Sequence, residues 1–445
     1  MKVCIIGTGD GGALAANQIR RLDREAQIDA FTSRRTLGCP PCPMVLVLGG
    51  KIATWDEIID GFRRNSFWEK RNINLHLNTG VTKIARDEKY IIANGKRYDY
   101  DKLVLALGAK PVIPPFPGLD GSNEFTLGTD MADGVALENA IRTHSEAAII
   151  GGGFIALEIA AALKARGYHK VYLLVRRAIL RAYLDEDMAK RLEEIIKDNG
   201  VELIQPAEIQ SIASQDGRKR ISLPDRELKV DFIFFATGAE PDVELARKAQ
   251  LQIGETGAIA VNQYLQTSDP DIYAIGDCME NWDIMTGSKR RLQLSSNAIR
   301  TGYIAGRNAI SGNHITYVGT VMPFVTKIFG HQVGAVGLTE REAREKGIDA
   351  ISVAVDTPHL RESFGGHPAH YRLTADAKTK TLIGAQIISE EIVSATVDKL
   401  AVGLACQMPL IKLVQIDSSY SPHVQKDQLA VPLHRLIDKL ESGGG

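Results

Sequence analysis

The chain has 445 residues, 44% of them apolar and 24% charged, which is typical of a globular protein. Its net charge of -1 gives no overall field that favours nucleic acid or an anionic membrane, so neither is expected as a partner. No apolar run is long enough to cross a bilayer and no signal peptide opens the chain, so we expect a cytoplasmic protein.

The chain opens on a strand, a glycine-rich turn and a helix. An apolar run at 3–6 leads into Gly7-Thr8-Gly9-Asp10-Gly11-Gly12, a helical pattern follows at 13–22, and a second strand follows at 28–31. Glycines stand at the three fingerprint places, which serve a tight turn, the approach of a pyrophosphate and helix packing. The position between a strand and a helix makes the pattern specific. The residues expected to contact a dinucleotide here are Gly7, Gly9, Asp10, Gly11 and Gly12.

No acid follows the second strand. A carboxylate there would accept the ribose hydroxyls, whereas this chain has Thr32 and Ser33, which form weaker hydrogen bonds.

The segment Cys39-Pro40-Pro41-Cys42-Pro43 precedes an apolar run at 44–48 that could form a helix. Proline suits the first helical position, so we expect the helix to begin at Pro43 with Cys42 as its N-cap residue. The helix dipole and the unpaired N–H groups there favour a thiolate. Cys42 is therefore predicted to be a low-pKa nucleophile and electron donor.

Three other interpretations of the two cysteines stay open. They could form a Cys39–Cys42 redox disulfide, hold zinc with further ligands, or simply pack in the core. Zinc is the weakest of these because no second cysteine pair follows, and no metal is expected. The chain has five cysteines, which do not suggest a secreted disulfide framework.

A second strand–turn–helix–strand unit starts at 147–150. It contains Gly151-Gly152-Gly153-Phe154-Ile155-Ala156, a helical pattern to residue 166 and a strand at 171–175. The expected acid is again missing, and the chain reads Val175-Arg176-Arg177. Arginine suits a 2′-phosphate, so this site favours NADPH over NADH.

Other apolar strands at 103–107, 232–236 and 272–275 end near Gly108, Gly238 and Gly276-Asp277. Ligands of open α/β sheets bind at such carboxyl ends. From about residue 318, strands and helices alternate in a pattern that indicates a third, α+β domain.

Together these features resemble the single-cysteine branch of the FAD-dependent pyridine nucleotide-disulfide oxidoreductases, which includes coenzyme A disulfide reductases, persulfide reductases and NADH oxidases and peroxidases. The resemblance implies an α/β chain with two Rossmann-like domains and a C-terminal α+β dimerisation domain. The expected boundaries are an FAD domain at 1–112 and 241–316, an NAD(P) domain at 113–240, and a dimerisation domain at 317–445.

The resemblance also implies roles for individual residues. Asp277 would hold the ribityl chain of FAD, Phe154 and Glu158 would line the nicotinamide pocket, and Tyr420 would reach Cys42 of the partner subunit in a homodimer. The remaining residues expected to contact FAD or NAD(P)H are Arg34, Val81, Leu107, Gly108, Gly151, Gly153, Ile155, Arg176 and Gly238. Coenzyme A is a candidate substrate or ligand, with phosphates expected at Arg20, Arg21, Lys70 and Arg71.

The expected activity is transfer of electrons from NADH or NADPH through FAD and Cys42 to a small sulfur substrate: a persulfide, a polysulfide or a coenzyme A disulfide. One alternative is an NADH oxidase or peroxidase, in which Cys42 cycles through a sulfenic acid. The aspartate at position 10 makes a peroxidase less expected, because peroxidase-like members of the family often have a histidine at this position. Another alternative is a reductase of a small electron-transfer protein.

Overall fold

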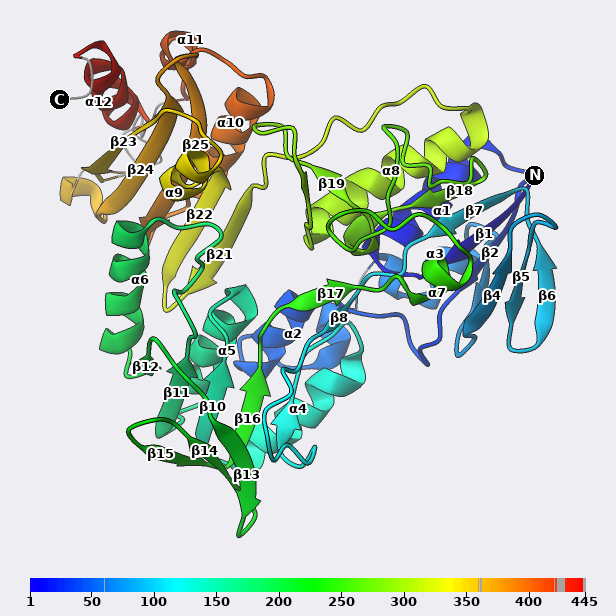
Figure 1. Ribbon diagram of the computed structural model, residues 1–445, viewed down its shortest axis with the longest axis horizontal. Coiled ribbons are helices and arrows are strands. Elements are labelled where there is room, and N and C mark those ends of the chain that lie inside the picture. The colour runs from blue at the N-terminus through cyan, green and yellow to red at the C-terminus, as the bar shows by residue number, and fades with distance from the viewer. Residues whose placement is uncertain (60, 359, 361, 420, 422–428, 443–445) are drawn as a thin grey trace.

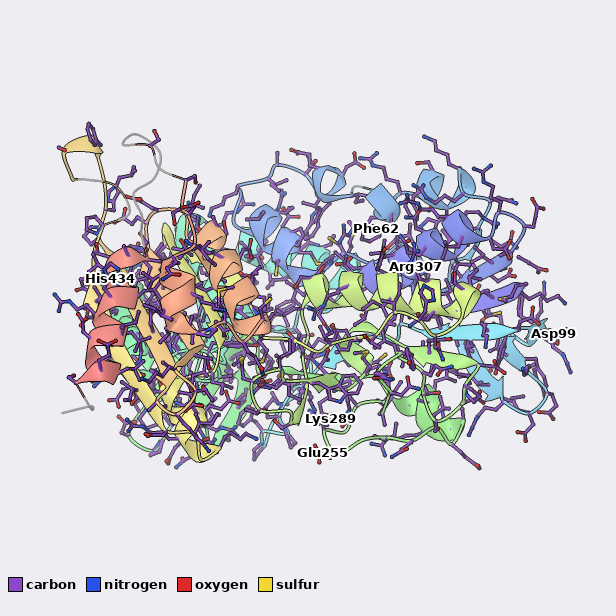
Figure 2. All side chains as sticks on the ribbon, turned by 90° about the horizontal axis from the view of Figure 1, so that it is seen from above. Phe62, Asp99, Glu255, Lys289, Arg307 and His434 are labelled. Atoms are coloured by element: carbon purple, nitrogen blue, oxygen red, sulfur yellow. The ribbon has the colours of Figure 1, made fainter. Side chains whose placement is uncertain are left out.

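The computed structural model describes residues 1–59, 61–358, 360, 362–419, 421 and 429–442. Three bodies are arranged around a central space, with the N-terminal body at the right of Figure 1, an inserted body at the bottom and the C-terminal body at the upper left. Figure 2 gives the view from above, with Asp99 of the N-terminal body and His434 of the C-terminal body at opposite ends.

The N-terminal body is built on a five-stranded parallel sheet of order β18-β7-β1-β2-β3. Helices α1 (Asp10–Leu22) and α8 (Ser295–Ser311) pack against each other and against this sheet. They can approach closely because Gly302 has no side chain. A Cβ at this position would lie only 2.3 Å from the Gly11 carbonyl oxygen. The strands are β1 (Lys2–Ile6), β2 (Gln27–Phe31), β3 (Asn74–His76), β7 (Lys102–Leu105) and β18 (Ile272–Ala274).

Several smaller elements complete this body. They are the antiparallel strands β4 (Val81–Ala85), β5 (Tyr90–Ala93) and β6 (Lys96–Asp99), the hairpin β19 (Asn281–Trp282) and β20 (Lys289–Arg290), and the helices α3 (Asn65–Glu69) and α7 (Glu244–Lys248).

The inserted body repeats the design with the parallel order β12-β11-β10-β16-β9. Its strands are β9 (Glu124–Phe125), β10 (Glu146–Ile150), β11 (Lys170–Leu174), β12 (Glu202–Ile204) and β16 (Phe232–Phe235). Its helices are α4 (Met131–Thr143), α5 (Phe154–Ala165) and α6 (Glu186–Asp198). A separate antiparallel sheet is made by β13 (Ser211–Gln215), β14 (Arg218–Ser222) and β15 (Glu227–Val230).

The chain crosses between these bodies on one two-stranded ladder. Strand β8 (Ala109–Pro111) leaves the N-terminal body and pairs antiparallel with β17 (Ala239–Pro241), which returns to it. The Thr237 hydroxyl donates to the Val112 carbonyl oxygen, and the Val112 N–H donates to Gly238 over 3.0 Å.

Helix α2 (Pro41–Leu48) comes from the N-terminal segment but packs on α4 and α5 of the inserted body. Met44, Val47 and Leu48 are fully buried in the same apolar core as Leu157. Each such side chain contributes roughly 1.5–3 kcal/mol when it is removed from water. The Arg166 guanidinium donates to the last carbonyl groups of α2, over 3.0 Å to Val47 and 2.8 Å to Leu48.

The C-terminal body is a five-stranded antiparallel sheet of order β21-β22-β25-β24-β23. The strands are β21 (Phe324–Ile328), β22 (His331–Gly337), β23 (Ala350–Asp356), β24 (Ala369–Asp376) and β25 (Thr381–Ser389). Its helices are α9 (Glu340–Glu345), α10 (Ser394–Ala405), α11 (Leu410–Val414) and α12 (Ala430–Glu441).

A buried carboxylate joins the inserted and C-terminal bodies. Asp185, at the N-cap of α6, accepts hydrogen bonds from the Gln386 side chain over 2.7 Å, the Arg372 guanidinium over 3.2 Å and the Glu340 N–H over 3.0 Å. Arg372 also pairs with Asp187 over 2.7 Å. Charged groups that are buried in this way need such partners.

The predicted fold class is confirmed: two parallel-sheet Rossmann-like bodies are followed by an α+β C-terminal body. The predicted strands and helices are present, with ends shifted by a few residues. The elements that the sequence reading missed include helices α4, α6, α8 and α12, the antiparallel sheets β4–β6 and β13–β15, and the ladder of β8 and β17. No helix in the described part of the chain is long and apolar enough to cross a membrane.

Candidate functional site

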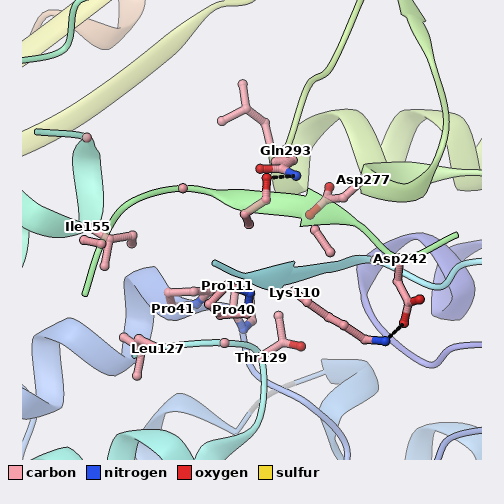
Figure 3. Close-up of a pocket in the computed structure, with 18 of the residues that line it drawn as sticks. Pro40, Pro41, Lys110, Pro111, Leu127, Thr129, Ile155, Asp242, Asp277 and Gln293 are labelled. Atoms are coloured by element: carbon pink, nitrogen blue, oxygen red, sulfur yellow. Dashed lines mark hydrogen bonds and ion pairs between the residues drawn. The ribbon is translucent and has the colours of Figure 1, made fainter. Parts of the chain in front are cut away.

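One cleft of about 1590 Å³ runs between the three bodies. Both glycine fingerprints, the start of α2, the ladder strands and strand β21 line it. Figure 3 shows the ladder in the middle of this cleft, with Asp277 and Gln293 on one side and Pro40, Pro41 and Leu127 on the other.

The first fingerprint leaves room for a phosphate group at the start of α1. Gly7 has a φ of +106°, and a Cβ on Gly12 would lie 2.0 Å from the Gly7 carbonyl oxygen, so both positions require glycine. A Cβ on Gly9, in contrast, would meet no atom within 4 Å. The helix N-terminus therefore faces open space, and the residues fit the pyrophosphate of a dinucleotide.

Two carboxylates lie beside this fingerprint. Asp10 is held by Arg63 over 2.9 Å and by the Ser295 hydroxyl. Asp277 forms no hydrogen bond with the described residues, and burial together with the charge of Asp10 raises its pKa to about 6. Asp277 is thus a half-buried acceptor on the wall of the cleft, which fits its predicted role of holding the hydroxyls of a flavin side chain.

The other residues predicted to contact FAD lie on the same cleft. Burial lowers the pKa of Arg34, whose guanidinium packs against the backbone at Gly38. The cleft-lining members of this set are Gly11, Thr32, Ser33, Arg34, Val81, Leu107 and Gly108.

The second fingerprint has the same construction. Gly151 has a φ of +137° and its Cβ would lie 2.1 Å from the Ala236 carbonyl oxygen, whereas a Cβ on Gly153 would meet no atom within 4 Å. This turn also fits a pyrophosphate. Its predicted cofactor residues all line the cleft: Gly151, Gly153, Phe154, Ile155, Glu158, Arg176 and Gly238.

Strand β21 of the C-terminal body closes the wall next to this fingerprint. The Phe154 ring lies 4.5 Å from the Phe324 ring and 4.9 Å from the Tyr183 ring, measured between ring centroids. The Thr326 hydroxyl donates to Glu158 over 2.6 Å, and the other carboxylate oxygen of Glu158 is buried without a hydrogen-bond partner among the described residues. Sequence reasoning missed Tyr183, Phe324 and Thr326, which belong to no recognised motif.

The helix that carries Cys42 begins earlier than predicted. Pro40 is the N-cap residue and Pro41 the first helical residue, so Cys42 is the second helical residue and the expectation of an N-cap cysteine is wrong. The reason is that two successive prolines can occupy the first turn, where the N–H groups have no helical partner. Cys42 is still exposed to the cleft at the start of the helix.

The expectation of a low pKa for Cys42 is also wrong for the protein without bound cofactor or substrate. The surrounding protein desolvates the thiol and the charge of Glu158 acts on it, and together they raise its pKa to about 12. These two effects exceed the stabilisation that the helix start gives to a thiolate.

Cys39 differs from Cys42 in exposure. Its side chain is fully buried in the core of the inserted body, and its N–H donates to the Thr129 carbonyl oxygen over 3.0 Å. None of the five cysteines forms a disulfide, and all five lie within the described residues. Among the described residues, no group of three or more His, Cys, Asp or Glu side chains is placed to hold a metal.

The residues predicted to bind coenzyme A phosphates do not line the cleft, and Arg20 needs a correction. All N–H groups of its guanidinium donate to backbone carbonyl groups, including those of Arg71 and Asn72, because the side chain ties α1 to the segment after α3. Arg71 donates to Asn17 and stacks on Phe67. Arg21 and Lys70 are exposed. Tyr420, predicted to reach Cys42 from the partner subunit, lies outside the described residues.

Comparison with known proteins places this architecture in context. The model of the pyridine nucleotide-disulphide oxidoreductases matches residues 1–302, and the model of their dimerisation domain matches residues 324–427. An NADH oxidase of Methanocaldococcus jannaschii is 30% identical over 432 residues, covering 95% of each chain. A coenzyme A-dependent NAD(P)H sulfur oxidoreductase of Pyrococcus abyssi is 32% identical over 430 residues, covering 94% of each chain. The structure of an NAD-dependent persulfide reductase from A. fulgidus is similar with a TM-score of 0.95 at 30% identity, covering 99% of this chain and 84% of that one.

Proposed function

Because the chain belongs to the pyridine nucleotide-disulphide oxidoreductase family, we propose that it is an FAD-dependent enzyme that uses NAD(P)H to reduce a small sulfur substrate at Cys42. The substrate class is a persulfide, a polysulfide or a coenzyme A disulfide, and the enzyme works as a homodimer in the cytoplasm. The observation that carries this proposal is that Cys42 opens into the same cleft as both fingerprints. The sulfur oxidoreductase and persulfide reductase relatives support the substrate class.

The residues of the cleft divide into two groups. When bound, FAD accepts a hydride from NAD(P)H and supplies an electron pair for the reduction of sulfur. The first fingerprint and Asp277 hold FAD, and the second fingerprint holds the pyridine nucleotide. Glu158 and the rings of Phe154, Tyr183 and Phe324 form a water-poor wall between these two sites and Cys42.

Cys42 carries out the sulfur chemistry. Its thiolate attacks a disulfide, forms a mixed disulfide and releases one thiolate. Addition of two electrons and one proton then cleaves the mixed disulfide, releases the second thiol and returns Cys42 as a thiolate. A persulfide reacts in the same way and yields a thiol and hydrosulfide. Because burial opposes thiolate formation, the Cys42 thiolate needs a positive charge or a hydrogen-bond donor from a bound substrate or cofactor.

Anaerobic half-reactions test this function. The holoenzyme is reduced with NAD(P)H and then mixed with coenzyme A persulfide, coenzyme A disulfide, oxygen, peroxide or a rubredoxin-like protein, while flavin absorbance is followed. Fast reoxidation by a sulfur compound, lost in Cys42→Ser with flavin reduction retained, supports the proposal. Faster reoxidation by oxygen or peroxide would favour the NADH oxidase that the M. jannaschii relative represents. Faster reoxidation by the small protein would favour an electron-transfer reductase.

Two further variants serve as controls. Cys406→Ser changes another exposed cysteine that does not line the cleft, and it should leave sulfur turnover unchanged. Cys39→Ala removes a thiol at the cleft wall and should cost little sulfur turnover, because the Cys39 side chain is fully buried whereas that of Cys42 is exposed. If Cys39→Ala is as inactive as Cys42→Ser, a dithiol mechanism replaces the single-cysteine mechanism.

A further inference from the structure

Helix α2, which the structure describes in full, has no charged side chain and no capping side chain of its own. The stretch 36–50 contains no charged residue, and the N-cap residue, Pro40, forms no side-chain hydrogen bond. The buried side chains of Met44, Val47 and Leu48 hold the helix laterally against α4 and α5, and Figure 1 shows the three helices side by side. Apolar contacts are non-directional, so they define the position of α2 along its own axis only weakly.

A guanidinium from the neighbouring helix holds the far end of α2. Arg166 is the C-cap residue of α5, and its side chain reaches across to α2. Its Nε donates to the Leu48 carbonyl oxygen over 2.8 Å, and its Nη2 donates to the Val47 carbonyl oxygen over 3.0 Å. The guanidinium is a planar fork, so its bonds to two successive carbonyl groups fix both the axial position and the rotation of the helix.

The glycine pair after α2 makes room for this guanidinium. Gly50 has a φ of +73°, and a Cβ at this position would lie 3.0 Å from Cζ of Arg166. A Cβ on Gly49 would lie 3.2 Å from the Cβ of Ala162, so α2 and α5 approach each other closely here. The local sequence is therefore fitted to the contact with Arg166.

Helices α2 and α5 both start at the cleft and meet again at their ends. Cys42, in the first turn of α2, and Phe154, at the start of α5, line the cleft, whereas Leu48 and Arg166 are in contact at the other end. The two helices therefore run in the same direction. Cys42 lies about 9 Å along the helix from Leu48. A short helix moves as a rigid rod, so an axial slip of about 1 Å at its end would displace the sulfur equally, and such a misplacement can slow a reaction about 100-fold.

We propose that Arg166 is a positioning residue for the sulfur chemistry, which sets the place of the Cys42 thiol in the cleft by holding the end of α2. The inference rests on the proposed function, because it takes Cys42 as the residue that exchanges with the sulfur substrate. Without the contact, α2 would shift along α5, and the thiol would become less enclosed but misplaced for exchange. Burial raises the pKa of the Cys42 thiol, so its release from the cleft wall should speed its alkylation even though sulfur exchange slows.

Two measurements on the holoenzyme separate these opposite effects. The first is the rate of Cys42 alkylation by iodoacetamide, read by peptide mass spectrometry with the exposed Cys406 as internal standard. The second is stopped-flow reoxidation of the NAD(P)H-reduced flavin by coenzyme A disulfide or coenzyme A persulfide, whichever reoxidises the wild type faster. For Arg166→Met we expect alkylation of Cys42 to be about threefold faster and reoxidation to be roughly 10- to 100-fold slower, with flavin reduction by NAD(P)H within about twofold of wild type.

Matched variants separate the contact from charge and from backbone strain. Arg166→Lys keeps the charge but lacks the fork, so its rates should lie between those of Arg166→Met and wild type. Lys164→Met also removes a positive charge from the end of α5, where Lys164 donates to the Tyr168 carbonyl oxygen over 3.1 Å, and it should match wild type. Gly50→Asn should change both rates as Arg166→Met does, because the new side chain displaces the guanidinium. Gly217→Asn should change neither, since Gly217 has a similar φ of +74° but open space around it.

A lower Tm in Arg166→Met with both rates unchanged would overturn the assignment, because Arg166 would then only stabilise the fold. Equal changes in Lys164→Met would also overturn it, since the lost charge would be the cause. Slower alkylation together with slower reoxidation would reject the positioning role in favour of a lost thiolate. If neither sulfur compound reoxidises the wild-type flavin, the proposed function fails, whereas the alkylation rates still decide whether Arg166 positions Cys42.

Discussion

The Thr326 hydroxyl donates a hydrogen bond of 2.6 Å to the Glu158 carboxylate and so links the C-terminal sheet to the helix of the second fingerprint. Burial raises the pKa of Glu158, and the hydrogen bond from Thr326 partly opposes this shift. The charge of Glu158 in turn raises the pKa of Cys42. A contact between two bodies of the chain thus acts on the predicted nucleophile.

Glu158→Gln should lower the pKa of Cys42, because it removes a negative charge that opposes the thiolate. The pH profile of Cys42 alkylation by iodoacetamide in the holoenzyme, followed by peptide mass spectrometry, should therefore move to lower pH. Glu194→Gln, at an exposed position of α6, should leave the profile in place. A shift to higher pH in Glu158→Gln would show that the carboxylate assists thiolate formation.

Gly9→Ala and Gly12→Ala should fail in different ways. Gly9 has a negative φ and open space around it, so the alanine variant should fold but lose FAD, because its methyl group occupies the expected phosphate position. In Gly12→Ala the methyl group meets the Gly7 carbonyl oxygen, which should cost roughly 1–3 kcal/mol of stability. Flavin absorbance per chain and thermal unfolding of the apoproteins distinguish the two. A yellow Gly9→Ala protein with normal FAD content would refute the assignment of this turn.

Asp277→Asn should stabilise the apoprotein at neutral pH and weaken FAD binding. An acid whose pKa rises from 3.8 to about 6 on folding makes the folded state less stable as pH increases between these values. Asparagine removes this penalty, which is roughly 1–3 kcal/mol above pH 6. Urea unfolding of the apoprotein at several pH values and FAD titration measure both effects. Asp87→Asn, at an exposed site, is the control, and a pH-independent difference between Asp277→Asn and wild type would contradict the explanation.

Asp185→Ala should destabilise the joint between the inserted and C-terminal bodies. It removes the buried acceptor of Gln386 and of the start of α9 and leaves Arg372 with only Asp187 and Glu340, and breaking a buried pair costs about 3–5 kcal/mol. A lower Tm is expected, whereas Asp198→Ala at the exposed end of α6 should have little effect. An unchanged Tm in Asp185→Ala would show that the hydrogen bonds accepted by Asp185 contribute no net stability to the joint.

Patterns that repeat locally in the sequence predicted most of the fold. Each glycine turn lies between a strand and a helix, so both nucleotide sites followed from short segments. Contacts between distant segments could not be predicted in this way. Nothing near Phe324 or Thr326 indicates that β21 forms the wall beside Phe154 and Glu158, since that placement depends on how whole bodies pack.

The errors at single residues have the same origin. Arg20 has the charge that a phosphate site needs, but its guanidinium donates to carbonyl groups of the following turn and to those of Arg71 and Asn72, about fifty residues later in the chain. Cys42 lies at a helix start as predicted, yet burial in the folded chain and the charge of Glu158 on α5 raise its pKa.

The packing of α2 has a mechanical consequence. The helix belongs to the N-terminal segment, but its buried side chains pack against α4 and α5. The Arg166 guanidinium donates hydrogen bonds to the carbonyl groups of its last turn. If the inserted body rotated about the β8–β17 ladder, α2 would move with it as a rigid unit. Because Cys42 lies in the first turn of α2, such a rotation would move its sulfur together with the second fingerprint and relative to the first fingerprint.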